Sequence, residues 1–202
     1  VRVSFIEERV DLRSKKILDV GCGGGLLSEA LSNLGAEVTA IDASEKTINI
    51  AKAHAKEVNS KVHYLKTSTE EFLSKRPELK FDVITCLEML EHVPEPSQTI
   101  KECASLLSEN GDLFLSTINR NPRSYLFAVL GAEYILNLLP KGTHDYSKFI
   151  KPSELSRWIR SANLNLIEII GLSYNPITDN YWLGADIGVN YLMHVKKVDE
   201  SY

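Results

Sequence analysis

The sequence predicts an α/β fold: a doubly wound, mostly parallel sheet of seven strands, with helices on both faces and an antiparallel last strand. Three observations support this fold class. First, an apolar strand runs into a glycine-rich turn and then into a helix. Second, apolar runs of strand length alternate with helical patterns along the chain. Third, an aspartate ends the second of these runs, at the edge of a parallel sheet where ligands bind.

The first unit of this fold is the stretch from Ile17 to Gly25, which reads ILDVGCGGG. A buried strand here ends in a turn that holds four glycines within five residues. Glycine suits such a turn because a ligand can approach a backbone that carries no Cβ. A helix is expected over Leu26–Leu34, and Gly35 is a typical residue to end it.

The turn favours S-adenosylmethionine over a dinucleotide. The dinucleotide fingerprint needs a third glycine where Leu26 stands. Asp19 lies two residues before the turn, where its carboxylate would repel a pyrophosphate and attract a sulfonium or an ammonium group. Asp42 ends the second strand, 21 residues after Gly21, and can accept hydrogen bonds from both ribose hydroxyls. The residues expected at this donor are Asp19, Gly21, Gly23 and Asp42, and an NAD-dependent oxidoreductase remains the alternative.

The composition fits one globular domain. The chain has 202 residues, of which 44% are hydrophobic, and this is enough for one full core. The net charge of −4 provides no basic surface, so no nucleic-acid partner is expected. The three cysteines are odd in number and widely spaced, which suits a reducing compartment, and each is expected to be a small buried residue. No run reaches the ~18 apolar residues of a membrane span.

The remaining elements follow the same alternation along one domain, residues 1–202. Further helices are predicted within Val1–Ser14, over Glu45–Val58 with Ser44 as the cap, from about Ser68, over Ser97–Leu107 and over Pro152–Ala162. Further strands are predicted over Glu37–Ile41, Lys61–Lys66, Phe81–Leu87, Gly111–Ile118, Leu164–Gly171 and Val189–Lys196. A loop is expected over Tyr174–Gly188, and a lid-like insertion at about 120–150.

The segment after the third strand reads Thr67-Ser68-Thr69-Glu70-Glu71-Phe72. In folds of this type the loop can border the adenine ring of the donor, so Ser68 and Thr69 are candidate contacts. The competing interpretation is plain helix capping by Ser68 or Thr69.

The second informative stretch is Leu87 to His92, after the fourth predicted strand. If Glu88 to His92 forms one helical turn, Glu88 shares a face with Glu91 and His92. Two carboxylates and an imidazole can bind a divalent cation. Oxygen ligands favour Mg²⁺ or Mn²⁺, and the imidazole favours Mn²⁺ or Zn²⁺. The alternatives are a solvated acidic turn, or His92 as a general base that a glutamate holds.

Strings along nearly the whole chain resemble the ubiquinone biosynthesis O-methyltransferase family, within the class I S-adenosylmethionine-dependent methyltransferases. They are ILDVGCGGG from Ile17, CLEMLEHV from Cys86, STINRN from Ser116, GAEYIL from Gly131, PKGTHDYSKFIKP from Pro140, and YNPIT and GVNY near the C-terminus. The glycine string is common to many methyltransferases, whereas EMLEH and PKGTH are specific to this family. The resemblance implies methylation of a ring hydroxyl on a polyprenylated catechol, and of a later demethylubiquinol.

The resemblance also implies roles for individual residues. Donor contacts are implied at Arg2, Gly21, Asp42 and Leu87, with Leu87 against the adenosine, whereas the pattern alone makes Arg2 a solvated end residue. The implied ligands of a divalent cation, Mg²⁺ first, are Glu88, Glu91 and His92. The implied partners are the prenylated substrate, the membrane surface and other proteins of ubiquinone biosynthesis. The expected location is peripheral, on the matrix side of the mitochondrial inner membrane or on the cytoplasmic face of a bacterial inner membrane.

Methyl transfer from a sulfonium to a phenol oxygen is an in-line displacement, which requires oxygen, methyl and sulfur in one line. A phenol has a pKa of about 10, so the enzyme has to favour the phenolate. A cation bound by both catechol oxygens would lower that pKa. The predicted proton acceptor is His144, or His92 if no cation binds, and a polar loop residue is the alternative role for His144.

The apolar stretch Tyr125–Pro140 is too short and too interrupted for a membrane span. Phe127, Leu130, Tyr134 and Leu138 share one helical face, which is equally typical of a core helix. Its place after the fifth strand suggests a cover for the prenyl tail that rests on the bilayer surface. A third class of function stands beside the two enzymes: a non-catalytic docking subunit that keeps the fold.

Overall fold

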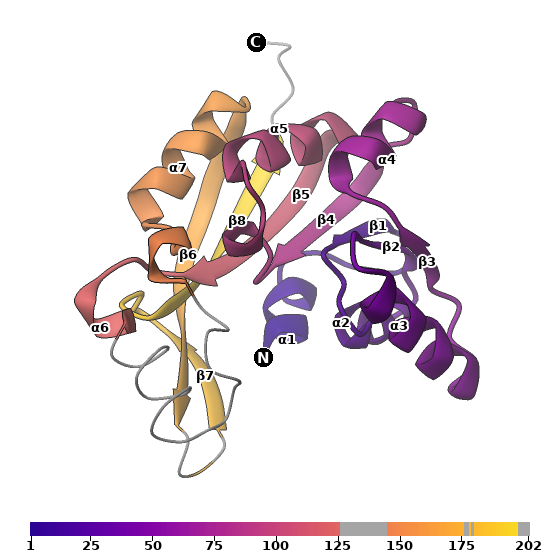
Figure 1. Ribbon diagram of the computed structural model, residues 1–202, viewed down its shortest axis with the longest axis horizontal. Coiled ribbons are helices and arrows are strands. Elements are labelled where there is room, and N and C mark those ends of the chain that lie inside the picture. The colour runs from indigo at the N-terminus through magenta and orange to yellow at the C-terminus, as the bar shows by residue number, and fades with distance from the viewer. Residues whose placement is uncertain (126–144, 176–177, 179, 198–202) are drawn as a thin grey trace.

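The computed structural model describes residues 1–125, 145–175, 178 and 180–197. These residues form a single sheet that carries helices on both faces (Figure 1), with the strand order β3-β2-β1-β4-β5-β8-β6-β7. The strands are β1 (Lys16–Val20), β2 (Glu37–Asp42), β3 (His63–Lys66), β4 (Phe81–Leu87), β5 (Leu107–Ile118), β6 (Leu164–Asn175), β7 (Asn180–Gly184) and β8 (Asn190–Lys197). The helices are α1 (Arg2–Glu7), α2 (Leu26–Asn33), α3 (Glu45–Glu57), α4 (Thr69–Lys75), α5 (Pro96–Leu106), α6 (Pro122–Ser124) and α7 (Pro152–Ser161), with 3₁₀ turns at Leu90–His92 and Tyr146–Lys148.

The strand directions confirm the predicted doubly wound α/β fold. β1 to β5 pair in parallel, and β8 lies antiparallel between β5 and β6, as predicted for the last strand. The strand order reverses between β1 and β4. Ligands of open α/β sheets bind outside the carboxyl ends of the strands at such a reversal.

One strand of the sheet was not predicted. The stretch Tyr174–Gly188 was expected to be a loop, but β7 lies inside it and forms an antiparallel hairpin with β6. In the hairpin Tyr174 pairs with Tyr181 and Ser173 with Trp182. The described sheet therefore has eight strands and not seven. No sequence pattern indicates β7 because Tyr181 and Trp182 are both exposed, so the apolar and polar alternation of a half-buried strand is missing.

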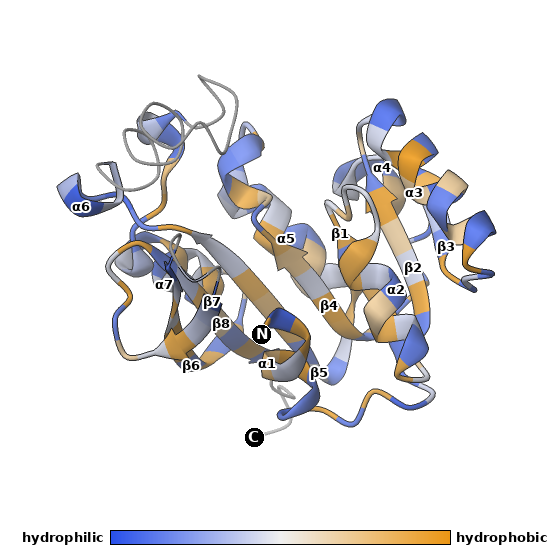
Figure 2. Cartoon of the chain, turned by 90° about the horizontal axis from the view of Figure 1, so that it is seen from below, coloured by the Kyte–Doolittle hydropathy of each residue, from blue (hydrophilic) through white to orange (hydrophobic). Residues whose placement is uncertain are grey.

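Two apolar clusters fill the two faces of the sheet. Side chains alternate along a strand, so Ile17 packs with α1, α2 and α3, whereas Leu18 packs with α4, α5 and α7. On the first face, the ring centroids of Phe5 in α1 and Phe114 in β5 are 5.8 Å apart. Figure 2 shows apolar colours along the central strands β1, β2 and β4. The two apolar clusters hold the sheet in place, and the carboxyl ends of its strands carry the site.

The predicted caps are confirmed. Ser44 Oγ accepts a hydrogen bond from the backbone N–H of Thr47 at 3.4 Å, at the start of α3. Ser68 Oγ accepts one from the backbone N–H of Glu71 at 3.1 Å, at the start of α4.

The first helix lies within the predicted range and covers less than half of it. Within Val1–Ser14 only Arg2–Glu7 is helical. The chain then turns, since Leu12 is buried in the core and Ser14 adopts a left-handed conformation with φ of 59° before β1. Two of the three cysteines are buried as predicted, Cys86 and Cys103, and burial raises the pKa of the Cys103 thiol to about 12, whereas Cys22 in the glycine turn is only half-buried.

Candidate active site

A cavity of about 760 Å³ opens at the carboxyl ends of β1, β2 and β4. This is the reversal of strand order where the fold places its ligands. Its walls come from segments that are far apart in the sequence. The predicted site residues that line it are Gly21, Gly23, Asp42, Ser68, Glu88 and His92.

The glycine turn after β1 forms a tight corner in this cavity. Gly21 and Cys22 donate their backbone N–H groups to the carbonyl of Ile41, at 2.8 and 3.1 Å. Gly21 has φ of +74° and Gly23 has φ of +53°, in the left-handed region that glycine adopts without a Cβ penalty. A Cβ on Gly21 would lie 2.3 Å from Met89 Cγ. The corner therefore requires glycine for its own packing as well as for a ligand.

Asp42 is held in place by two backbone groups. One carboxylate oxygen accepts from the N–H of Gly23 at 3.0 Å, and the other accepts from the N–H of Ser44 at 2.8 Å. Each oxygen keeps a further lone pair. The carboxylate can therefore accept hydrogen bonds from the two hydroxyls of a ribose in the cavity, as its spacing from the glycine turn predicts.

Asp19 occupies a different position from the other predicted donor residues. It is buried, with 2% exposure, and is not among the residues that line the cavity. Its carboxylate accepts from the hydroxyls of Ser28 at 2.5 Å and Thr85 at 2.7 Å. Burial raises the pKa of Asp19, and the two hydroxyl hydrogen bonds oppose that rise. In this structure Asp19 ties β1 to α2 and β4, and a direct contact with the donor stays a prediction.

Glu88 sits just after β4 in a left-handed conformation, with φ of +53°. Its backbone N–H donates to Ser116, and its carboxylate accepts from Ser116 Oγ at 2.7 Å. Asn190 Nδ2 donates to the same carboxylate at 3.1 Å, and Arg2 forms an ion pair with it at 3.2 Å. Three other segments of the chain, α1, β5 and β8, thus converge on the Glu88 side chain.

Glu91 is more deeply buried than Glu88, with 4% exposure. Its carboxylate accepts from Thr117 Oγ1 at 2.8 Å. Burial raises the pKa of Glu91 to about 7, the negative charge of Glu88 adds to this rise, and the Thr117 hydrogen bond opposes it. The charges of the two glutamates therefore interact, although Glu91 is more deeply buried than Glu88.

The geometry differs from the one expected for a metal site. Glu88 lies outside the 3₁₀ turn Leu90–His92, so Glu88, Glu91 and His92 do not share one helical face as expected. The carboxylates of Glu88 and Glu91 are instead bonded to neighbouring side chains. In the part of the chain that the structure describes, no group of three His, Cys, Asp or Glu side chains is arranged to hold a metal ion. The residues as placed do not fit a preformed cation site.

The other predicted site residues, Leu87, Arg2 and His144, are not among the described residues that line the cavity. Leu87 ends β4 half-buried and is not among the lining residues. Arg2 reaches the cavity wall through Glu88. His144 and nearly all of Tyr125–Pro140 lie outside the described residues.

Sequence reasoning missed three residues that hold the glutamates: Ser116, Thr117 and Asn190. Ser116 and Thr117 come from β5, and Asn190 comes from β8, next to β5 in the sheet. The signal that would have found them is the pair of strings STINRN and GVNY, which support the family resemblance and contain all three residues.

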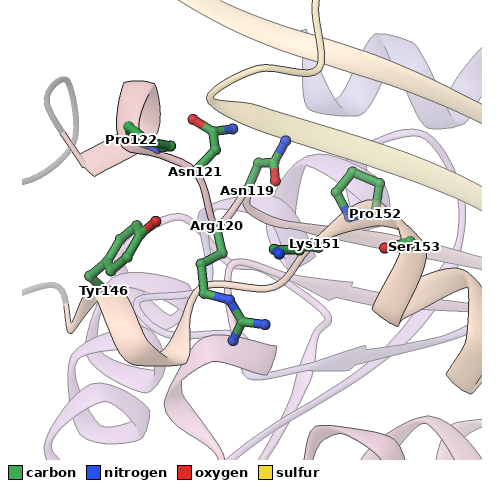
Figure 3. Close-up of a pocket in the computed structure, with 8 residues that line it drawn as sticks. All are labelled: Asn119, Arg120, Asn121, Pro122, Tyr146, Lys151, Pro152 and Ser153. Atoms are coloured by element: carbon green, nitrogen blue, oxygen red, sulfur yellow. The ribbon is translucent and has the colours of Figure 1, made fainter.

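Figure 3 shows a second cavity, of about 730 Å³, between the segment after β5 and the start of α7. It is lined by Asn119, Arg120, Asn121, Pro122, Tyr146, Lys151, Pro152 and Ser153. The guanidinium of Arg120 pairs with Glu154 and donates to the carbonyl of Ser147 at 3.4 Å. The described lining of this cavity contains neither a glycine turn nor a carboxylate, so we assign the donor to the first cavity.

Comparisons with known proteins define the class. Residues 2–169 match the family model for the methyltransferase domain. The fold is similar to that of a SAM-dependent methyltransferase from Methanosarcina mazei, with a TM-score of 0.71, 19% identity, and coverage of 97% of this chain and 98% of that one. It is also similar to magnesium protoporphyrin IX methyltransferase from Synechocystis PCC 6803 with bound SAH, with a TM-score of 0.68, 21% identity, and coverage of 97% and 80%. The chain is a methyltransferase.

Relatives with much higher identity define the family. A protein of Saccharophagus degradans is 56% identical over 199 residues, covering 98% of this chain and 84% of the relative. One from Dechloromonas aromatica is 58% identical over 193 residues, covering 96% and 83%. Both are named ubiquinone biosynthesis O-methyltransferase. The chain belongs to this family, which confirms the resemblance and decides against the oxidoreductase and docking-subunit alternatives.

Proposed function

We propose that this protein transfers the methyl group of S-adenosylmethionine to a ring hydroxyl of a polyprenylated catechol or demethylubiquinol in ubiquinone biosynthesis. The names of the similar proteins support the reaction and the substrate class. The observation that carries the proposal is the donor cavity, where the glycine corner meets the fixed carboxylate of Asp42.

The charge of the cavity supports this donor. Its described lining contains the carboxylates Asp42, Glu70, Glu88, Glu95 and Glu102, and neither lysine nor arginine. Such a wall attracts the sulfonium and the ammonium of S-adenosylmethionine. A pyrophosphate would meet repulsion there, with no cation among these residues to offset it.

The role of the protein in the reaction is alignment and proton removal. Asp42 and the glycine corner fix the nucleoside, so the methyl group faces the β4 end of the cavity, where Glu88 and His92 lie. His92 is our candidate for the group that takes the phenol proton, because it lines the cavity next to the reacting end. His144 remains a second prediction from the sequence.

A divalent cation also remains a prediction from the resemblance. The present placement of Glu88, Glu91 and His92 does not fit it, since Arg2 already neutralises Glu88. No step of the proposed mechanism therefore passes through a metal. Activity that is unchanged in chelator supports this mechanism. Loss of activity that Mg²⁺ restores would show instead that Glu88, Glu91 and His92 bind the cation.

We further propose a peripheral location at a membrane, because a polyprenyl tail partitions into lipid. The two ubiquinone biosynthesis O-methyltransferases cited above come from bacteria, which favours the cytoplasmic face of a bacterial inner membrane over a mitochondrial one. No helix among the described residues is long and apolar enough to cross a bilayer. Flotation with liposomes, with and without anionic lipid, tests the surface contact, and absence of binding in both would contradict it.

The proposed activity has a direct test. Purified protein is incubated with S-adenosylmethionine carrying a labelled methyl group and a catechol with a short prenyl tail. Label is expected on one ring oxygen, and the Asp42→Ala variant should transfer far less at the same subsaturating donor concentration. A wild-type protein that binds the donor but labels no catechol would contradict the assigned acceptor class.

A further inference from the structure

A small hollow of about 240 Å³ adjoins the donor cavity, between the 3₁₀ turn Leu90–His92, residues 147–150 and α7. Val93 and Pro94 line both the hollow and the donor cavity. Within the 3₁₀ turn, His92 lines the donor cavity and Leu90 lines the hollow. A ligand at the β4 end of the donor cavity is therefore separated from the hollow by a single turn of the chain.

The lining of the hollow is largely apolar, whereas the donor cavity is acidic. Leu90, Phe149 and Ile150 form its buried side, each with 2% exposure or less. Trp158 of α7 also lines it and is half-buried. Apolar side chains of this kind are stabilised when a hydrocarbon group replaces the water against them. The hollow therefore suits a hydrocarbon group.

The charged side chains at the hollow disfavour an ionic ligand. Glu91 accepts a hydrogen bond from Thr117 Oγ1 at 2.8 Å, and Arg120 forms an ion pair with Glu154. Lys148, which also lines the hollow, is exposed and can keep its ammonium group in water. An ionic ligand would compete with these contacts, whereas a hydrocarbon leaves them intact.

The size of the hollow indicates a part of a ligand and not a whole one. Pockets that enclose a small molecule measure about 300–1,000 Å³. The donor cavity, at about 760 Å³, lies within this range, and the hollow lies below it. An aromatic ring in the donor cavity can reach the hollow with a short apolar substituent.

We propose that the hollow binds the isoprene unit next to the ring of the acceptor, while the ring itself lies at the β4 end of the donor cavity. This inference rests on the proposed function. The bound unit fixes the ring by its substituent, so that a ring hydroxyl faces the methyl group. Trp158 is then a specificity-determining residue that favours a prenylated catechol over a free catechol.

The first test compares a catechol that carries one isoprene unit with a catechol that carries none, both with labelled S-adenosylmethionine. In the wild type the isoprene unit should raise kcat/KM at least about tenfold. Trp158→Ala should reduce this gain to about twofold, and Trp158→Phe should keep most of it, because the phenyl ring still covers the hollow.

Trp182→Ala is the matched control. Trp182 is the other tryptophan of the chain, lies on β7 with 49% exposure, and does not line the hollow. This variant should keep the full wild-type gain. All three variants should bind S-adenosylhomocysteine as the wild type does, and calorimetry of this binding shows that they are folded.

The second test measures binding without methyl transfer. The chain has two tryptophans, so Trp182→Phe leaves Trp158 as the only source of indole emission. The catechol with one isoprene unit, added without the methyl donor, should shift this emission to shorter wavelength as hydrocarbon replaces water beside Trp158. The free catechol at the same concentration should leave the emission wavelength unchanged.

The inference is overturned if Trp158→Ala keeps the wild-type gain, if Trp182→Ala loses it equally, or if both catechols have the same effect on the Trp158 emission. An emission shift with the prenylated catechol, in a protein that methylates no catechol, supports the hollow as a prenyl site and contradicts the proposed function alone. The two failures are thus distinguishable.

Discussion

The two halves of the proposed site, the donor half around Asp42 and the acceptor half around Glu88, are built in different ways. In the donor half, the groups that shape the site are close in sequence: Gly21 to Gly25 form the corner, and Asp42 accepts from Gly23 only 19 residues away. In the acceptor half, Glu88 is held by Ser116, 28 residues on, and by Asn190, 102 residues on.

This difference separates what a local motif can specify from what only the assembled sheet can specify. The donor half depends on backbone conformation, which glycine and a neighbouring carboxylate determine within one βαβ unit. The acceptor half depends on three strands, β4, β5 and β8, meeting in the correct register. Variants in the two halves should therefore fail in different assays.

The largest effect is expected from Asp42→Ala. Hydrogen bonds to a charged group contribute about 1.5–3 kcal/mol each, so losing two from the ribose should weaken S-adenosylhomocysteine by at least about 100-fold. Calorimetry measures this, and binding of the catechol alone should not change. If the affinity for S-adenosylhomocysteine falls less than about fivefold, Asp42 does not bind the ribose.

The next effect is a pH dependence of stability from Glu91. Its folded pKa of about 7 lies above its ordinary 4.5, so the folded state holds the proton that the unfolded state loses as pH rises. Wild-type stability should therefore fall between about pH 4.5 and pH 7, relative to Glu91→Gln, by on the order of 2 kcal/mol. Urea unfolding of both proteins at pH 5 and pH 7.5 measures it. Parallel pH curves for the two proteins would show that Glu91 titrates normally.

A smaller effect is expected from Asn190→Ala. Glu88 would lose one of the donors that fix its carboxylate, so kcat/KM for the acceptor should fall about tenfold, as for a lost hydrogen bond to a charged group. The affinity for S-adenosylhomocysteine should stay within about twofold, because the donor half is intact. Asn180→Ala, at an exposed asparagine of β7, is the matched control. Equal losses in donor affinity and turnover would mean that the two halves are not separable.

The smallest effect is expected on the surface. Lys75 pairs with Glu71 at 2.7 Å along α4, and their side chains are 69% and 50% exposed. An exposed pair of this spacing contributes about 0.3–0.5 kcal/mol, so Lys75→Ala should shift the free energy of unfolding by no more than that. A loss above about 1 kcal/mol would show that α4 supports the cavity more than its exposure suggests.

The same contrast explains how much could be predicted from the sequence. The glycine turn, Asp42 and the caps Ser44 and Ser68 are local signals, and the structure has each where the sequence predicts it. The helical turn expected from Glu88 to His92 was wrong, because the left-handed Glu88 is bonded to β5 and β8, and periodicity carries no information about such contacts. Strand β7 was missed for a related reason, since its exposed aromatic residues show no alternation.

The position of β8 has a consequence for how the chain acquires its site during synthesis. Among the described strands β8 is the last to leave the ribosome, yet it lies between β5 and β6 in the sheet. Until β8 inserts, the facing edges of β5 and β6 are unpaired, and Glu88 has no hydrogen bond from Asn190. A nascent chain can thus complete its nucleoside corner early. The Glu88 side of the site is complete only once β8 has inserted, so a translation product interrupted before β8 would hold the nucleoside corner without Asn190.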